Sequence, residues 1–335
     1  MAVVDMLTRR GFLIGVSGAA LAFVGACSSD GDGDGGSSAR GTGAVIGNKF
    51  GETRIPPGPQ RVVSVGYNDQ DAILALGATP VGVFDWYGNH PNAVWPWAQH
   101  LLAGATPVIV GSASAGISIE QVAAVDPDLI VGTYSGLTED EYHKLSALAP
   151  TVAQPGEFAD YGVPWQDQTR IIGEALGKSD RAAELVASVG KQFTDVAAAN
   201  PAFAGKTVIV GALDSPGQFG VYGPEDPKVR FFTELGFVNP PVTQQITTTN
   251  FAQISTEQLA LADVDLLVWY AGGGYGDTLR AELDRTPLYQ QLDVVEDGRT
   301  IILEDEAAEA MTWSTVLSLP YALAAIPSRI APLLV

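Results

Sequence analysis

Short apolar runs rich in β-branched residues alternate with helical patterns along most of this 335-residue chain. The runs predict buried strands at 61–65, 79–84, 108–110, 129–132 and 151–153 in the first half, and at 207–211, 266–269 and 300–303 in the second. The segments between them predict helices at 69–76, 139–148, 227–235, 257–261 and 315–326. Strands that alternate with helices indicate largely parallel sheets covered on both faces, so we expect an α/β fold.

One stretch of twenty residues occurs twice. Residues 117–136 read ISIEQVAAVDPDLIVGTYSG and residues 254–273 read ISTEQLALADVDLLVWYAGG, with ten of the twenty positions identical and an offset of 137 residues. In each copy a serine, Ser118 or Ser255, stands three residues before a glutamine, as in an N-terminal capping box. A pair of aspartates then leads into a buried strand. The repeat therefore predicts two related α/β lobes.

A helical pattern lies between the two lobes. Apolar residues keep near-helical spacing over 164–200, where Pro164 suits a helix start and Pro201 lies beyond the end. Two interpretations remain open: one long linker helix, or two helices with a turn at 177–180. We expect an N-terminal lobe over 44–163, a linker helix over 164–200 and a C-terminal lobe over 201–335.

The first residues have the features of an export signal. A basic pair, Arg9 and Arg10, precedes an apolar run of sixteen residues, which is shorter than the ~20 residues of a membrane span. The segment TRRGFL resembles the twin-arginine export signal. We therefore expect a signal peptide over 1–26.

The end of this signal indicates a lipid anchor. The tetrapeptide VGAC resembles a bacterial lipobox, in which Cys27 becomes the lipidated first residue of the mature chain. The alternative is a plain secretory signal with an incidental cysteine. Residues 27–43 are rich in Gly, Ser and Asp and predict a flexible tether. We expect an extracytoplasmic protein anchored to the outer face of the cytoplasmic membrane.

Composition narrows the classes of partner. The chain has a net charge of −20, and removal of the signal, which contributes +1, leaves −21. This charge argues against nucleic acid and against a basic membrane-binding face. Cys27 is the single cysteine, so neither a disulfide nor a cysteine-based metal site is expected within one chain.

Four motifs follow one another along the chain: RVVSVGYNDQDAILALGATPVGV, SIEQVAAVDPDLIVGTYSG, LSALAPTVA and STVLSLPYAL. In this order they resemble the iron-chelate class of substrate-binding lipoproteins that serve ABC importers, from about residue 50 to the C-terminus. The stretch YNDQD…DWYGNHPNAVWPWA is similar to siderophore- or haem-binding members of Gram-positive bacteria. The resemblance implies two Rossmann-like lobes joined by one long α-helix, with a ligand cleft between the lobes and little hinge closure.

The same resemblance implies a function. We expect a monomer that is not an enzyme, has no intrinsic cofactor, and delivers a ferric siderophore to the permease of an ABC importer. Haem or cobalamin is the alternative ligand. Members of the family carry one permease-docking glutamate on each lobe, and these positions fall on Glu120 and Glu257. The alternative is that both glutamates only favour the positive end of their helices.

Candidate ligand-binding residues follow the predicted strands, because ligands of open α/β sheets bind beyond the carboxyl ends of the strands. Most are aromatic, and flat rings suit a bulky, partly apolar chelate. They are Tyr67, Trp86, Tyr87, Trp95, Trp97, Tyr134, Tyr222, Tyr270, Tyr275 and Trp313, together with Arg230. Trp95 and Trp97 are alternatively staples of a long loop, and Trp269, within a strand, is expected in the core.

The charged residues narrow the class of ligand that we expect. A triply anionic catecholate needs a cluster of arginines, which the sequence does not display, so neutral or mixed hydroxamate siderophores are preferred, with haem next. For haem, Tyr67 is the candidate iron ligand, and no other protein metal ligand is expected. The run EDEAAE, residues 304–309, is interpreted as a solvated acidic loop rather than a cation site.

Two rival classes of function have less support in the sequence. An exported hydrolase lacks support because no G-x-S-x-G elbow follows the signal, and His90, His100 and His143 have no metal-ligand spacing. A lipoprotein that organises the envelope without transport differs from the preferred class only in its permease contacts.

Overall fold

The computed structural model describes residues 43–215, 217–246 and 251–335, excluding the side chains of 244–246. The predicted signal peptide and nearly all of the predicted tether, with Arg9, Arg10 and Cys27, lie outside this part of the chain. Within it, no helix is long and apolar enough to cross a bilayer.

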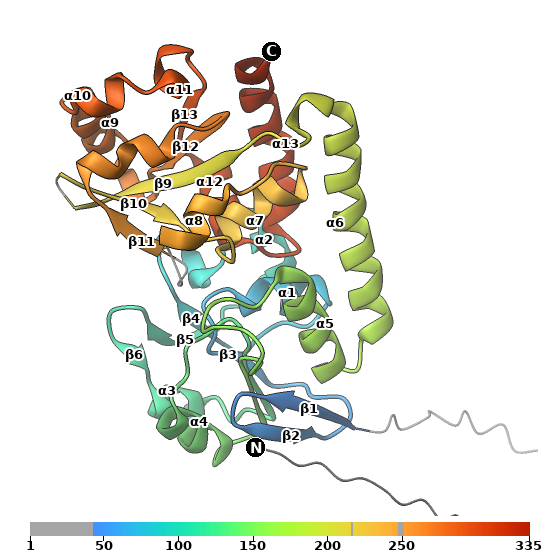
Figure 1. Cartoon of the computed structure of the whole chain (residues 1–335). Coiled ribbons are helices and arrows are strands. Elements are labelled where there is room, and N and C mark those ends of the chain that lie inside the picture. Colours follow the sequence, from blue (N-terminus) through green and yellow to red (C-terminus); the bar gives the residue numbers. More distant parts are fainter. Residues whose placement is uncertain (1–42, 216, 247–250) are drawn as a thin grey trace, which may run out of the picture. The chain divides into compact units, whose positions relative to one another are not determined.

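The N-terminal lobe is built on a six-stranded sheet in the order β6-β5-β4-β3-β7-β8, of which Figure 1 labels β3 to β6. All neighbours are parallel except β5 and β6. The strands are β3 (Val62–Ser64), β4 (Gly82–Asp85), β5 (Val108–Ser112), β6 (Gly116–Ile117), β7 (Leu129–Gly132) and β8 (Thr151–Ala153), and an antiparallel pair, β1 (Ala44–Asn48) and β2 (Gly51–Ile55), precedes them. The helices are α1 (Asp69–Ala75), α2 (Pro96–Gln99), α3 (Ile119–Ala124) and α4 (Glu139–Ser146), with short 3₁₀ turns η1 (Pro91–Ala93) and η2 (His100–Leu102).

The C-terminal lobe has a five-stranded sheet in the order β11-β10-β9-β12-β13, in which β9, β12 and β13 are parallel. The strands are β9 (Val208–Ser215), β10 (Gln218–Tyr222), β11 (Phe251–Ile254), β12 (Leu266–Tyr270) and β13 (Thr300–Leu303). The helices are α7 (Pro227–Glu234), α8 (Pro241–Ile246), α9 (Gly276–Asp284), α10 (Pro287–Gln290), α11 (Asp293–Glu296), α12 (Glu306–Trp313) and α13 (Ser318–Ile330), with 3₁₀ segments η3 (Pro201–Phe203), η4 (Thr256–Ala262), η5 (Gly272–Gly274) and η6 (Ala331–Leu334). The predicted α/β fold with two related lobes is confirmed.

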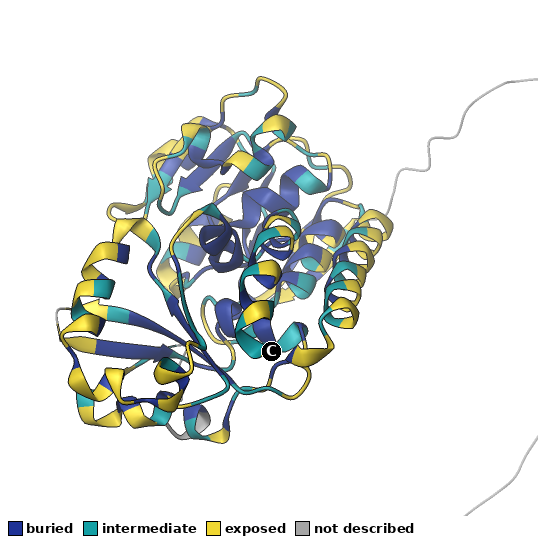
Figure 2. Cartoon of the chain, turned by 90° about the horizontal axis from the view of Figure 1, so that it is seen from above, coloured by how far each residue is buried: buried dark blue, intermediate teal, exposed yellow. Residues whose placement is uncertain are grey.

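Successive residues of each central strand belong to different hydrophobic cores. In β12, Leu266 and Val268 join the core beneath α7, α12 and α13, whereas Leu267 and Trp269 join the core on the other face. The central strands are buried while the outer faces of the helices are exposed (Figure 2). Both faces of the sheet are therefore covered, which is why these strands appear as continuous apolar runs. Trp269 is 1% exposed, as predicted for a core residue.

The segment between the lobes is two helices, α5 (Trp165–Ala175) and α6 (Ser179–Ala199), of which the 21-residue α6 is the long helix that joins the lobes (Figure 1). The single helix expected over 164–200 is thus interrupted, in favour of the alternative that the sequence left open. Gly177 has φ +67, a left-handed conformation that ends α5. A Cβ on Gly173 would lie 2.4 Å from the Cβ of Ala182, so this glycine permits the close packing of α5 on α6.

The repeated sequence forms the same structural clamp in each lobe. Asp128 accepts the backbone N–H groups of Gln60 and Arg61 at 2.7 and 2.8 Å, which ties the start of β7 to the start of β3. At the equivalent position, Asp265 accepts the N–H and hydroxyl of Thr207 at 2.9 and 2.8 Å, which ties β12 to β9.

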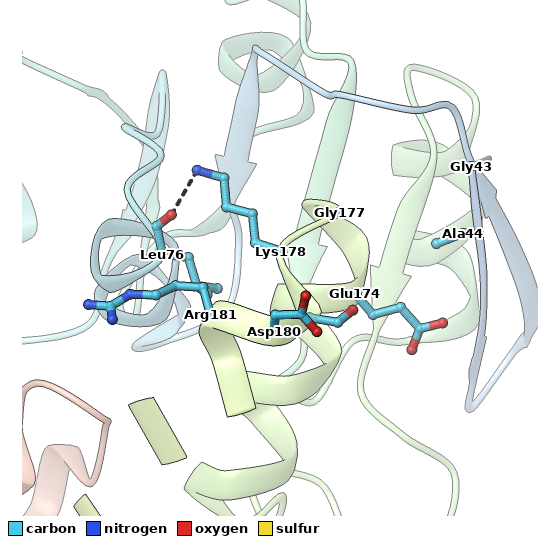
Figure 3. A pocket seen from close by; sticks show the side chains of 9 residues that line it. Gly43, Ala44, Leu76, Glu174, Gly177, Lys178, Asp180 and Arg181 are labelled. Carbon is cyan, nitrogen blue, oxygen red and sulfur yellow. Dashed lines mark hydrogen bonds between the residues drawn. The ribbon is translucent and has the colours of Figure 1, made fainter. Parts of the chain in front are cut away.

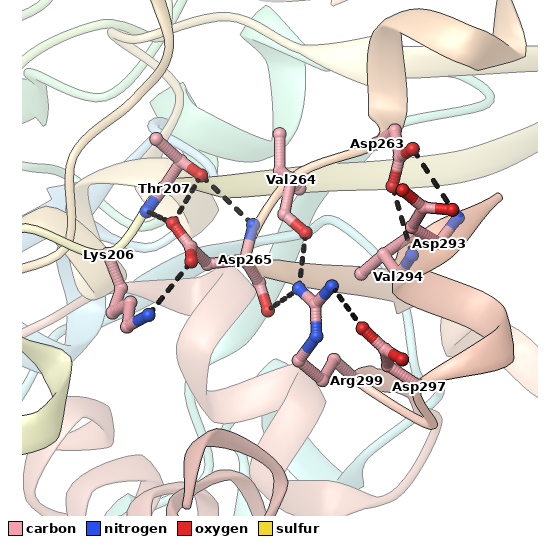
Figure 4. A network of polar contacts seen from close by, with 9 residues as sticks. All are labelled: Lys206, Thr207, Asp263, Val264, Asp265, Asp293, Val294, Asp297 and Arg299. Carbon is pink, nitrogen blue, oxygen red and sulfur yellow. Dashed lines mark hydrogen bonds and ion pairs between the residues drawn. The ribbon is translucent and has the colours of Figure 1, made fainter.

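Two cations strengthen the second clamp. Lys206 donates to Asp265 at 3.0 Å, and Arg299 donates to the carbonyl oxygens of Val264 and Asp265 (Figure 4). The backbone bond from Thr207 is the main cause that lowers the pKa of Asp265 to about 2. The twofold occurrence of the motif is explained by this shared role at the entry to each sheet.

Candidate functional site

Aromatic rings of the N-terminal lobe gather at the carboxyl ends of its strands. Tyr67 follows β3, and its ring stacks on Phe84 with centroids 5.2 Å apart and an angle of 8°. The ring of Trp86, which follows β4, lies 5.1 Å from that of Tyr67. Tyr161, which the sequence analysis missed, lies 4.7 Å from the Tyr67 ring and donates its hydroxyl to the Tyr67 oxygen at 3.2 Å.

These rings continue into the C-terminal lobe through Trp313, the last residue of α12. Trp313 is 1% exposed and stacks on Trp86 with centroids 5.2 Å apart. Trp95 and Trp97 stack on each other at 4.9 Å and 7°, and Trp95 lies 5.3 Å from Trp313. We call this set the interlobe aromatic cluster: Tyr67, Phe84, Trp86, Tyr87, Trp95, Trp97, Tyr134, Tyr161 and Trp313.

A buried carboxylate lies where this cluster meets the C-terminal lobe. Glu309, on α12, is 7% exposed. Its Oε2 accepts the hydroxyl of Tyr87 from the N-terminal lobe and that of Tyr270 from β12, both at 2.9 Å, and its Oε1 accepts the Gly273 N–H at 3.0 Å. Burial, with the negative charge of Glu309 adding to it, raises the pKa of both phenols, which keeps them protonated as donors. The expectation that 304–309 forms a solvated acidic loop is wrong at Glu309, because α12 turns this residue inward.

Two cations lie beside the cluster, and each has a carboxylate partner. Lys228 is 6% exposed, lies 3.1 Å from Asp226 and sits 3.8 Å from the centre of the Tyr222 ring. Burial acts to lower the pKa of Lys228, but Asp226, Tyr222 and Glu309 together outweigh burial, and the pKa is raised. Arg230 donates to the Gly162 carbonyl at 2.8 Å and pairs with Glu225. Lys228 was missed, since nothing in its sequence neighbourhood distinguishes it from a surface lysine of a helix.

The remaining predicted ligand residues differ in their surroundings. Tyr134 is buried, with its ring 6.1 Å from that of Tyr161, and burial raises its pKa. The ring of Tyr222 lies 6.4 Å from that of Tyr270. Tyr275 is 65% exposed, and the ring contacts of the described residues do not include it. The structure thus brings all of the predicted aromatic residues except Tyr275 into one connected region.

The start of α1 fastens the two lobes together beneath this region. Asn68 donates to the carbonyl of Trp313 at 2.6 Å, and Asp71 accepts the hydroxyl of Thr315 at 2.6 Å and the indole N–H of Trp97 at 2.9 Å. Burial raises the pKa of Asp71 to about 6. Asp69 is also buried and binds the N–H and hydroxyl of Thr133. The sequence offered one signal for this junction: four consecutive polar residues, NDQD, at the start of an apolar helix.

Two hollows, one beside the aromatic cluster and one away from it, help to locate the site. A pocket of about 90 Å³ lies beside Tyr67, between the β5–β6 turn and Tyr161. A wider hollow of about 780 Å³ lies at the turn between α5 and α6, where Lys178 donates to the Leu76 carbonyl at 2.8 Å (Figure 3). Its lining contains no aromatic residue. The aromatic cluster, rather than this polar hollow, is therefore the candidate binding site.

The two candidate docking glutamates occupy equivalent positions on the two lobes. Glu120 lies in the first turn of α3 and Glu257 in η4, and both are exposed. The helix predicted over 257–261 is a 3₁₀ helix. The Ser118 hydroxyl accepts the Gln121 N–H at 3.3 Å, and the Gln258 side chain accepts the Ser255 N–H at 2.9 Å, so neither glutamate is needed for capping. The docking role itself stays a prediction.

In proteins, metal ions are bound by clusters of side chains. Among the residues that the structure describes, no group of three or more His, Cys, Asp or Glu side chains is arranged to hold a metal ion.

Comparison with known proteins identifies similar chains of nearly the same extent. A family model described as "Periplasmic binding protein" matches residues 62–307. The Fe(3+)-citrate-binding protein YfmC of Bacillus subtilis (strain 168) is 26% identical over 293 residues, which cover 87% of this chain and 86% of that protein. The probable siderophore-binding lipoprotein YfiY of the same strain is 26% identical over 272 residues, 78% of each chain. The crystal structure of a periplasmic solute binding protein from Mycobacterium smegmatis str. MC2 155 is 36% identical, with a TM-score of 0.77, and covers 88% of this chain and 99% of that one.

Proposed function

This chain belongs to the periplasmic binding protein family, and we propose that it captures a ferric siderophore at the boundary between its lobes and delivers it to an ABC importer. The interlobe aromatic cluster is the observation that carries the proposal. Rings from both lobes meet at the carboxyl ends of the strands, which is where ligands bind in open α/β sheets. Large flat rings offer area to a bulky, partly apolar chelate. The names of the relatives YfmC and YfiY support iron chelates as the ligand class.

The charges beside the cluster favour some chelates over others. Lys228 is paired with Asp226 and Arg230 with Glu225, so neither cation is available to neutralise a highly anionic ligand. A tricatecholate needs several unpaired cations that form charge-assisted bonds. We infer that a neutral or weakly charged hydroxamate-type chelate is preferred.

Delivery requires a membrane location and a permease. We propose that Cys27 anchors the protein by a lipid on the outer face of the cytoplasmic membrane, and that Glu120 and Glu257 dock against cations of the permease. Their exposure and their equivalent positions on two related lobes support the second point. A monomer without catalytic turnover suffices for this role.

A titration of residues 43–335 with ferric siderophores and with haemin tests the proposal. Tryptophan emission reports binding, because Trp86, Trp95, Trp97 and Trp313 lie in the cluster. Iron-free siderophores and a matched quencher correct for light absorbed by the ligands. Saturable quenching by a ferric siderophore at micromolar or tighter affinity supports the proposal.

Alanine substitutions test which residues form the binding site. Tyr67→Ala and Trp86→Ala should weaken binding, whereas Phe50→Ala should not, because Phe50 stacks on Tyr142, outside the cluster, at 4.8 Å. Saturation by haemin alone, with a shifted Soret band, would replace the siderophore by haem and make Tyr67 the candidate iron ligand. The absence of saturation with any iron chelate would overturn the proposal and direct the search to cobalamin or to a role without transport.

A further inference from the structure

Three donors around Glu309 point at its carboxylate. The hydroxyl hydrogens of Tyr87 and Tyr270 both go to Oε2, and the Gly273 N–H goes to Oε1. Each phenol oxygen has thereby used its single hydrogen and keeps its lone pairs. A ligand that approaches these two tyrosines, which are only partly buried, therefore meets hydrogen-bond acceptors.

Glu309 has no ion pair of its own among the salt bridges of the described residues. The buried Lys228 lies 3.8 Å from the ring centre of Tyr222 and 5.4 Å from that of Tyr270, but it is paired with Asp226 at 3.1 Å. The negative charge of Glu309 strengthens the phenol oxygens as acceptors, because hydrogen bonds polarise one another in a buried site. Aromatic faces nearby attract cations as well, as the position of Lys228 over Tyr222 at 3.8 Å shows.

We propose that Glu309, Tyr87 and Tyr270 form a specificity site for a positively charged, hydrogen-donating group of the iron chelate, such as the primary ammonium of an amine-bearing ferric hydroxamate. The two phenol oxygens accept from the ammonium, and Glu309 supplies the opposing charge. The inference rests on the proposed function but goes further, since it names the part of the chelate that is recognised. A carboxylate or catecholate group at the same place is disfavoured, because it finds acceptors and a like charge.

The same residues also help to hold the lobes together, since the hydrogen bond from Tyr87 to Glu309 joins the N-terminal lobe to the C-terminal lobe. Loss of this bond alone would weaken the binding of every ligand equally. Recognition of a charge, in contrast, changes the preference between two chelates that differ only in that charge. The ratio of two affinities therefore separates the two roles.

Ferrioxamine B, a ferric trihydroxamate with a free ammonium, and its N-acetylated form, which is neutral, are the probes. We expect the wild-type protein to bind ferrioxamine B at least about tenfold more tightly than the acetylated form, as one charge-assisted hydrogen bond implies. Glu309→Gln should reduce this ratio to near one, and Tyr270→Phe should reduce it while keeping the ring.

The matched control is Glu306→Gln on the same helix. Glu306 also accepts a tyrosine hydroxyl, that of Tyr321 at 3.1 Å, but lies one turn away from the proposed site. This variant should keep the wild-type ratio, and thermal unfolding of all variants shows whether each one folds.

The outcomes separate this inference from the function on which it rests. Tight binding of both ferrioxamines with a ratio near one in the wild-type protein would overturn the specificity site and leave siderophore capture intact. Tighter binding of a ferric tricatecholate than of ferrioxamine B would overturn it too. Failure of every ferric chelate to bind would overturn the proposed function itself.

Discussion

Replacement of Asp71 by asparagine should stabilise the protein at neutral pH. Asp71 lies at the start of α1 with its side chain fully buried, and its partners, Thr315 and Trp97, are both neutral. A carboxylate buried without a cation is costly in its charged form, and burial accordingly raises the pKa of Asp71 to about 6. Asparagine has nearly the same shape, and its single oxygen can still accept from both Thr315 and Trp97, because both donate to the same oxygen of Asp71.

The magnitude and its sign follow from the pKa. An unfolded chain titrates Asp71 near pH ~3.9, so the folded state binds this proton more tightly. The folded state is favoured while Asp71 is protonated in both states, and this advantage is lost as the pH rises from about 4 through about 6. A shift of about two pKa units corresponds to about 3 kcal/mol. The free energy of unfolding of Asp71→Asn relative to wild type should therefore rise by up to about 3 kcal/mol between pH 4 and pH 7.

Urea unfolding, followed by circular dichroism at several pH values, measures this difference. Asp195→Asn is the control, because Asp195 is an exposed residue of α6 whose pairing with Lys191 should contribute little at any of these pH values. A difference between Asp71→Asn and wild type that stays constant from pH 4 to pH 7 would refute the reasoning, since it would mean that Asp71 titrates normally in the folded protein.

Three further predictions concern binding, stability and transport. Trp86→Ala should weaken ferric-siderophore affinity by roughly 1–3 kcal/mol, because Trp86 contacts rings of both lobes; an unchanged dissociation constant in the fluorescence titration would remove the cluster as the site. Asp265→Asn should lower the free energy of unfolding at pH 7 by roughly 1 kcal/mol, a figure reduced because Asp265 is one-third exposed. Because folding lowers the pKa of Asp265, this loss of stability should vanish as the pH falls from about 4 toward 2. Urea unfolding at pH 7 and at pH 3 measures the difference. Charge reversal at both Glu120 and Glu257 should abolish siderophore uptake in cells while the purified protein binds as before; normal uptake would refute the docking role.

The sheets could be predicted wherever burial alone decides the structure. The strand predicted at 129–132 matches β7 because all four of its residues are buried in a parallel sheet, which makes its apolar run continuous. Strands β10 and β11 were missed, since they run antiparallel beside β9 and are less uniformly apolar, and β10 contains Gly220. A Cβ on Gly220 would lie 2.0 Å from the ring of Phe251, so the glycine is required by packing that only the folded sheet reveals.

The apolar part of the site was predictable and its charged part was not. Tyr67 and Trp86 follow recognisable strands, and position after a strand is a local property. The burial of Glu309, Lys228 and Asp71 depends on groups brought from other elements, such as the phenol of Tyr87 for Glu309. Sequence neighbours give no sign of such partners, and for this reason the sequence alone predicts a solvated loop at 304–309.

The contacts at the start of α1 also constrain how the protein acquires its native structure. Asn68 and Asp71 find their partners 245 and 244 residues further along the chain. Such distant contacts are slow to form, and they cannot form during synthesis until nearly the whole chain has been made. The N-terminal lobe can assemble its sheet early. The part of the aromatic cluster formed by Trp97 and Trp313 cannot become ordered until α12 and the turn that follows it have been synthesised. A chain truncated before Thr315 would therefore retain most of its strands and lose the ordered surface on which the iron chelate is proposed to rest.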